Sequence, residues 1–129
     1  MKVLGANGLQ YLITKLMGVD FIVEEGTSGI WTYRKWNSGK IELWGDASGS
    51  VTAYGNYSYG YNYYMTVSFP FTLNSVINYQ ASAQLASQIT ITSLVKEGVT
   101  TSSMQVYASC PQGGTQPIYA KIYVLGTWK

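Results

Sequence analysis

The sequence contains no histidine and only one cysteine, Cys110. Histidine is the commonest general base, and histidine and cysteine together supply the usual zinc ligands and the partners of activated nucleophiles. Their scarcity excludes zinc, serine–histidine and cysteine–histidine chemistry. A single cysteine cannot form an intrachain disulfide, which excludes a small secreted domain held together by disulfides. Cys110 alternates with Met104, Val106 and Ala108, and we expect it to be a buried core residue.

Charge is also scarce, since charged residues make up 11% of the chain and the formal net charge is +2. Scattered lysines and arginines do not form the basic patch that nucleic acid requires, so we expect no nucleic-acid partner. Glycoside hydrolysis needs two carboxylates facing each other across a cleft. Glu42 and Asp46 are the only close pair beside aromatic residues, but Glu42 is better explained as the cross-strand partner of Arg34. With no phosphate-binding or calcium-binding loop motif, we expect no enzyme, cofactor or metal.

Long apolar runs are absent, because none approaches the roughly 20 residues needed to span a bilayer. We therefore expect no membrane insertion. The first 17 residues lack a long apolar core and a small-residue cleavage site, so we expect no signal peptide there. What the chain does contain is 12 tyrosines, 14 glycines and many serines and threonines. This composition is typical of a single β-rich domain whose surface forms hydrogen bonds without charge, as in particle-borne and sugar-binding proteins.

Residues 31–45 hold three of the four tryptophans. Alternating bulky and polar residues on both sides of Asn37-Ser38-Gly39 predict a β-hairpin. A three-residue loop, with Gly39 in the left-handed conformation, would place Arg34 opposite Glu42. It would also gather four bulky residues on one buried face: Trp31, Tyr33, Ile41 and Leu43. A two-residue loop would pair Lys35 with Glu42 and invert the faces; we favour the first register because it buries the aliphatic pair with two aromatic rings.

An amphipathic helix is predicted over residues 8–17, with Asn7 as its N-cap and Gly18 at its end. Its apolar residues recur at helical spacing: Leu9, Leu12, Ile13, Leu16 and Met17. A helix this short must bury its apolar stripe on another surface. That surface is either the domain's own sheet or two further copies of the helix around a three-fold axis, and the sequence leaves both open.

The remainder of the chain, residues 19–129, predicts a mainly β fold, an antiparallel β-sandwich of about eight or nine strands. We treat residues 1–18 as a separate N-terminal helix for docking or trimer contact. Besides the two arms of the hairpin, we expect seven strands: residues 19–25, 51–57, 65–69, 76–85, 88–95, 103–110 and 118–125. Residues 46–50 and 111–117 are expected loops.

A tyrosine-rich segment, residues 54–64, has the most unusual composition in the chain. Tyrosine supplies rigid amphipathic area, and the small polar residues between the tyrosines supply hydrogen bonds, which together are typical of recognition surfaces. Flat rings beside amides also suit the faces of sugars. The hypothesis is a ligand-binding face made by five residues: Tyr57, Tyr59, Tyr61, Asn62 and Tyr63. Packing of these tyrosines on a neighbouring subunit or over a sheet edge is the alternative.

Three short motifs carry a resemblance to a known family. They are the hairpin WTYRKWNSGKIELWG, the later segment Phe69-Pro70-Phe71-Thr72 and the ending Gly126-Thr127-Trp128-Lys129. Together they resemble the C-terminal domain of phage tail fibres and related receptor-binding proteins. The segment Asn7-Gly8-Leu9-Gln10-Tyr11-Leu12 is similar to helix openings in tail-associated proteins of phages of Gram-positive bacteria.

The resemblance implies a β-sandwich at the distal end of a homotrimeric fibre, bound to other tail proteins and to a saccharide or protein on the host surface. It implies a virion tail or a prophage-derived tail-like particle, made in the bacterial cytoplasm. The matched positions are implied to be scaffold: Trp31, Trp36, Gly39, Trp44, Gly45, Phe69, Pro70, Phe71 and Trp128. Our expected function is non-enzymatic, carbohydrate-binding host attachment. A purely structural tail protein is the alternative, and a soluble lectin outside any phage is a third.

Overall fold

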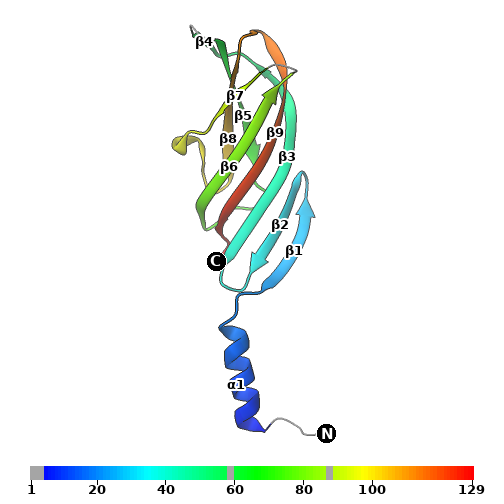
Figure 1. Ribbon diagram of the computed structural model, residues 1–129, viewed down its shortest axis with the longest axis vertical. Coiled ribbons are helices and arrows are strands. Elements are labelled where there is room, and N and C mark those ends of the chain that lie inside the picture. Colours follow the sequence, from blue (N-terminus) through cyan, green and yellow to red (C-terminus); the bar gives the residue numbers. More distant parts are fainter. Residues whose placement is uncertain (1–4, 58–59, 87–88) are drawn as a thin grey trace.

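The computed structural model describes residues 5–57, 60–86 and 89–129, which form one helix, nine strands and one 3-10 turn (Figure 1). The elements follow in the order α1 (Ala6–Met17), β1 (Ile22–Ser28), β2 (Trp31–Trp36), β3 (Lys40–Thr52), β4 (Gly55–Tyr57), β5 (Gly60–Ser68), β6 (Ser75–Leu85), β7 (Ile91–Ser93), η1 (Lys96–Gly98), β8 (Ser103–Cys110) and β9 (Thr115–Thr127).

The strands form two antiparallel sheets. The five-stranded sheet has the order β1-β2-β3-β9-β6, and the four-stranded sheet has the order β4-β5-β8-β7. Their facing sides supply two apolar clusters. In the larger one, Leu43 and Val124 from the first sheet pack with Val67 and Val106 from the second. Cys110 is buried, as expected. The predicted fold class, an antiparallel β-sandwich with one short N-terminal helix, is therefore confirmed.

The hairpin has the favoured three-residue loop. Arg34 pairs with Glu42 in the register of β2 and β3, and Gly39 has a φ of +98°, which only glycine adopts readily. Trp31, Ile41 and Leu43 are buried on the face that the alternation predicted. The ion pair of Arg34, however, is formed with a different acid. The Arg34 Nε lies 3.4 Å from Glu25 Oε1 on the neighbouring strand β1.

Strand β3 is longer than its sequence suggests. The expected loop over residues 46–50 is wrong, because the ladder between β3 and β9 continues without interruption from Lys40↔Thr127 to Thr52↔Thr115. Glycine, serine and aspartate have low intrinsic strand propensity, but a partner strand on the core side overrides it. For the same reason β9 begins at Thr115, inside the expected loop over residues 111–117.

The shorter strands also differ from the expected ranges. Residues 51 and 52 belong to β3, so only Gly55–Tyr57 remains of the expected strand 51–57. The expected strand 88–95 contains only the three residues of β7. The strand predicted over residues 103–110 is β8, with the same bounds.

Helix α1 begins at Ala6, so Asn7 lies inside its first turn and the predicted N-cap is wrong. The helix extends away from the sheets (Figure 1), and Leu9, Leu12 and Ile13 are exposed along it. The side chains of Leu16 and Met17 lie outside the described part. The apolar stripe therefore does not pack on the domain's own sheet, which is one of the two expected partners.

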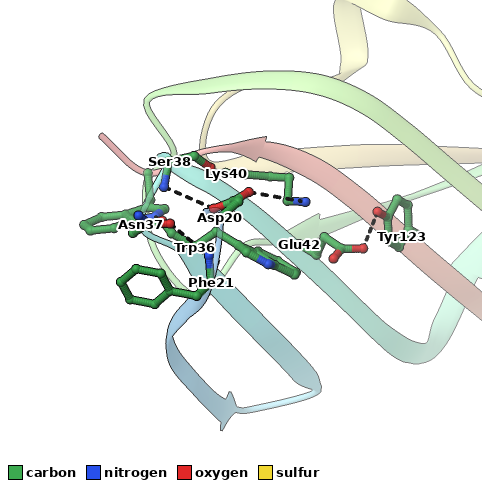
Figure 2. Close-up of polar contacts among 9 residues, drawn as sticks. Asp20, Phe21, Trp36, Asn37, Ser38, Lys40, Glu42 and Tyr123 are labelled. Atoms are coloured by element: carbon green, nitrogen blue, oxygen red, sulfur yellow. Dashed lines mark hydrogen bonds and ion pairs between the residues drawn. The ribbon is translucent and has the colours of Figure 1, made fainter. Parts of the chain in front are cut away.

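The chain leaving the helix is held at the tip of the hairpin (Figure 2). Ser38 N donates to Asp20 Oδ1 at 3.3 Å, and Phe21 N donates to Asn37 Oδ1 at 3.0 Å. The Lys40 ammonium lies 3.9 Å from Asp20 Oδ2. These contacts fix where the helix leaves the sheets.

The motif residues meet at this end of the molecule and in the adjoining core. Trp128 Nε1 donates to the Trp36 carbonyl at 2.9 Å, so the C-terminus closes over the hairpin loop. The Phe69 ring stands edge-on to Trp31, with centroids 5.7 Å apart. These contacts are structural, as the resemblance implied for the matched positions.

Candidate functional site

The tyrosine-rich segment divides between the two faces of the four-stranded sheet. Tyr63 is fully buried, and its hydroxyl donates to the Gln112 carbonyl at 2.6 Å. Burial, followed by the charges of Cys110 and Tyr61, raises the pKa of Tyr63. The expected place of Tyr63 on a ligand-binding face is therefore wrong, because its ring belongs to the core.

The other predicted residues have different surroundings. Tyr61 points to the same side of β5 as Tyr63, and its ring covers Gly113, where an added Cβ would lie 2.7 Å from Cε1. Tyr57 is described as a strand residue paired with Gly60, and Tyr59 lies outside the described residues. Asn62 alternates with Tyr61 and Tyr63, so it belongs to the outer face of the sheet.

Three tyrosines that the sequence hypothesis did not select lie together on this outer face. Tyr64 is directly opposite Tyr107 in the ladder between β5 and β8, with ring centroids 5.8 Å apart. The Tyr54 ring lies 5.5 Å from Tyr64 and 6.4 Å from Tyr107, in edge-on orientations. The Tyr107 hydroxyl donates to Gln105 Oε1 at 2.8 Å, which fixes the ring.

Beside this cluster the outer face is hollowed into a groove of about 340 Å³, which we name the tyrosine groove. Its lining residues are uncharged and come from β5, β7, β8 and the segments next to them: Tyr54, Asn62, Ile91, Ser93, Val95, Tyr107, Ala108 and Ser109. Ser109 Oγ donates to Asn62 Oδ1 at 2.6 Å, which orients the amide. The groove thus combines aromatic rings, aliphatic side chains, one amide and hydroxyl groups.

The signal that could have located this face was the alternation of β8. Met104, Val106, Ala108 and Cys110 were expected to be buried, which leaves Tyr107 and Ser109 on the other side of the same strand. The pair Tyr63-Tyr64 must likewise place one ring on each face. The sequence hypothesis followed the odd-numbered tyrosines, and those on β5, Tyr61 and Tyr63, lie on the other side of the strand from Tyr64.

The two sheets differ in their content of charged residues. No charged residue occurs in residues 47–95 or 98–120, so β4, β5, β7 and β8 carry no charge. The strands β1, β2, β3 and β9 of the five-stranded sheet carry charges, and ion pairs join Lys35 to Glu24 and Lys121 to Asp46. A second, larger hollow of about 550 Å³ lies over β3, β9 and β6, and it contains this Lys121–Asp46 pair and Tyr119.

The two acids considered for catalysis are both engaged. Glu42 Oε2 accepts a hydrogen bond from the Tyr123 hydroxyl at 2.5 Å (Figure 2). Burial, and then this bond and the negative charge of Glu42, raise the pKa of Tyr123 to about 12. Asp46 is paired with Lys121. In residues 5–57, 60–86 and 89–129, no group of three or more cysteines or acids could hold a metal, and no helix is long and apolar enough to cross a membrane.

Comparison with known proteins gives matches in structure. No protein-family model and no curated protein matches the sequence. The P. aeruginosa R1 pyocin fibre comprising C-terminal residues 323–701 matches with a TM-score of 0.63 and 15% identity, over 96% of this chain and 32% of that one. An N-truncated R1-type pyocin tail fibre also matches with a TM-score of 0.63, at 14% identity, over 98% of this chain and 99% of that one.

The chain has the fold of these pyocin fibre segments. It spans about a third of the length of the first structure and nearly all of the second. At this identity the likeness concerns the fold, and on that level it agrees with the resemblance to tail-fibre C-terminal domains. The expectation of a Gram-positive host stays a prediction.

Within this pyocin-like fold, the tyrosine groove and the helix are far apart. Strand β4, which follows Tyr54, lies at one end of the long axis, and α1 lies at the other (Figure 1). The motif residues Trp36, Gly39 and Trp128 lie at the end of the sheets near the helix, where Trp128 N donates to the Gly39 carbonyl at 2.8 Å. The groove is therefore separate from the scaffold contacts.

Proposed function

We propose that this chain is a non-enzymatic receptor-binding module of a phage or prophage-derived tail fibre, and that the tyrosine groove binds a glycan on the bacterial surface. The observation that carries the proposal is the groove itself. It places the exposed Tyr54 ring and the half-buried Tyr107 ring next to an oriented amide and serine hydroxyls on a rigid sheet, and such residues dominate adaptable recognition surfaces. The shared fold with pyocin fibre segments supports the placement in a fibre.

The positions of α1 and the tyrosine groove at opposite ends of the subunit support a location at the tip of a fibre. The exposed apolar stripe of α1 needs a partner, and two further copies of the same helix around a three-fold axis would cover it. We therefore place α1 in a homotrimeric stem that leads to other tail proteins. The groove, at the opposite end of each subunit, then faces the host.

Paired substitutions on the two outer faces test the proposal. The double variant Tyr54→Ala/Tyr107→Ala removes two walls of the groove, and Tyr119→Ala removes an exposed tyrosine from the five-stranded sheet as a matched control. Fluorescently labelled proteins are incubated with a panel of bacterial strains and counted by flow cytometry, while light scattering gives their oligomeric mass. We expect the double variant to lose tenfold or more of its cell binding and to keep its mass, and the control to bind as the parent does.

The chemical nature of the receptor is tested on the cells. Mild periodate oxidises vicinal diols of sugars, and a protease removes surface proteins, so pretreated cells distinguish the two kinds of receptor. Loss of binding after periodate, with binding kept after protease, is the expected result. Loss of binding after protease treatment alone would indicate that the receptor is a protein and not a glycan.

A purely structural role in tail assembly is the second candidate, favoured by exposed apolar residues near the helix. Phe21, Ile22 and Val23 are exposed next to α1, as expected for surfaces covered by neighbouring subunits. Under this alternative no strain is bound, and the tyrosine substitutions lower the oligomeric mass instead.

A further inference from the structure

We infer that the tyrosine groove accepts an uncharged pyranose unit and discriminates against sugars that carry phosphate, sulfate or carboxylate. This inference rests on the proposed glycan-binding function and names the class of ligand. Many bacterial surface polymers are anionic, so the distinction separates two large groups of receptors.

Size limits the ligand first. The groove encloses about 340 Å³, which corresponds to roughly eleven waters at about 30 Å³ each. One pyranose ring with its hydroxyl groups fits in this space together with a few bridging waters. The unit that fits is therefore a single residue of a longer polymer, with the chain leaving through the open side.

The absence of charge in the groove also limits the ligand. A buried anion needs a cationic side chain or a set of backbone N–H donors, because an unpaired charge is costly to desolvate. The groove residues carry no charge, and neither do the four strands of its sheet. Lys96 and Glu97 follow Val95 directly, and their opposite charges cancel. The described cations lie on α1, in the five-stranded sheet, in η1 and at the C-terminus: Lys15, Arg34, Lys35, Lys40, Lys96, Lys121 and Lys129.

The chemistry of the lining matches a neutral sugar. A pyranose presents C–H groups on its ring faces and hydroxyl groups at its edge. Tyr54 and Tyr107 on one side and Ile91 on the other offer surfaces for the C–H groups. Asn62 Oδ1 is occupied by Ser109, so the amide presents Nδ2 as a donor to a sugar hydroxyl.

The groove is also preorganised. The three ring contacts of the tyrosine cluster and the Gln105–Tyr107 hydrogen bond hold Tyr54 and Tyr107 in place before a ligand arrives. Little side-chain freedom is then lost on binding. Uncharged hydrogen bonds and ring contacts are individually weak, so such preorganisation matters more here than in a site that relies on charge.

The test measures how cell binding responds to charge. A strain bound by the parent protein is titrated with labelled full-length chain in NaCl from about 50 mM to about 500 mM, over which screening increases strongly. The variant Ser93→Lys adds a cation to the groove, and Ser48→Lys adds one to the five-stranded sheet as a control. We expect the apparent Kd to change less than twofold with salt, and Ser93→Lys to give no gain over Ser48→Lys.

The outcomes separate this inference from the function on which it rests. If Tyr54→Ala/Tyr107→Ala abolishes binding but the parent loses tenfold or more of its affinity in high salt, or Ser93→Lys binds more tightly than Ser48→Lys, the ligand is anionic. The inference then fails while the proposed function stands. If no strain is bound, or if the double variant binds like the parent, both fail together.

Discussion

Replacing Tyr63 by phenylalanine tests whether this tyrosine belongs to the core or to a ligand-binding face. The substitution keeps the buried ring and removes the hydroxyl that donates to the Gln112 carbonyl at 2.6 Å. A net hydrogen bond contributes about 0.5–1.5 kcal/mol, and the Gln112 carbonyl keeps a second donor, Cys110 Sγ at 3.2 Å. We therefore expect Tyr63→Phe to lower the free energy of unfolding by about 0.5–1.5 kcal/mol.

In a domain of this size, each kcal/mol shifts the melting temperature by roughly 4 °C. The expected decrease for Tyr63→Phe is therefore about 2–6 °C. Melting is followed by circular dichroism at one fixed protein concentration, because oligomerisation makes the melting temperature depend on concentration. Tyr61→Phe is the matched control, since the Tyr61 side chain is partly exposed. Substitutions of surface residues usually change the free energy of unfolding by no more than about 0.5 kcal/mol.

Cell binding of the same variant completes the test. Because Tyr63 is fully buried, Tyr63→Phe is expected to bind cells as the parent does. An unchanged melting temperature together with a loss of cell binding would place the hydroxyl in the ligand site. That result would refute the division of the tyrosine-rich segment into an inner and an outer face.

Three further predictions follow from the scaffold. Gly45→Ala places a Cβ 2.6 Å from the Ile30 carbonyl oxygen, so urea titration should show a loss of about 1–3 kcal/mol. Folding raises the pKa of Tyr123 from 10.0 to about 12; its contribution to stability is therefore present below pH 10 and lost as the pH rises to 12, and unfolding of Tyr123→Phe should lack this dependence. Leu9→Asp/Leu12→Asp puts charge on the exposed stripe of α1, so light scattering should show a lower oligomeric mass while the β-sheet circular dichroism persists.

Each of these predictions has a control and a contradicting result. Gly5→Ala adds a Cβ with nothing within 4 Å and should leave the urea midpoint unchanged; equal stability of both alanine variants would contradict the close approach at Gly45. A free energy of unfolding of the parent protein that stays constant between pH 10 and 12 would contradict the raised pKa of Tyr123. Lys15→Asp changes the charge of α1 outside its apolar stripe, and loss of mass in that variant would show that charge alone dissociates the oligomer.

The hairpin was predictable because its signals are local. The three-residue loop and the glycine at its end fix the register, and the register fixes which side chains are buried. The ion pair was not predictable from the hairpin alone. Arg34 has Glu42 opposite it on β3, but β1 places Glu25 opposite it on the other side, and which acid is chosen depends on a strand outside the motif.

The uninterrupted β3 and the uncovered helix could not be predicted for a related reason. The segment Asp46 to Ser50 has the composition of a loop, and only its long-range ladder with β9 makes it a strand. The apolar stripe of α1 carries no information about which surface covers it. For β3, the deciding contact is with residues that are distant in sequence.

Under the proposed function, one strand serves stability and recognition through separate sets of side chains. On β8, Val106 and Ala108 face the core while Tyr107 and Ser109 face outward, and β5 repeats the arrangement with Tyr63 and Tyr64. Because the buried set already fixes the strand in the sheet, outward residues can be exchanged at little cost in stability. The proposed receptor-binding role needs this freedom, since a change of receptor would have to alter the groove without unfolding the domain. The same separation explains why the short sequence motifs identify the fold and not the ligand: they lie among the scaffold contacts, and the groove lies outside them.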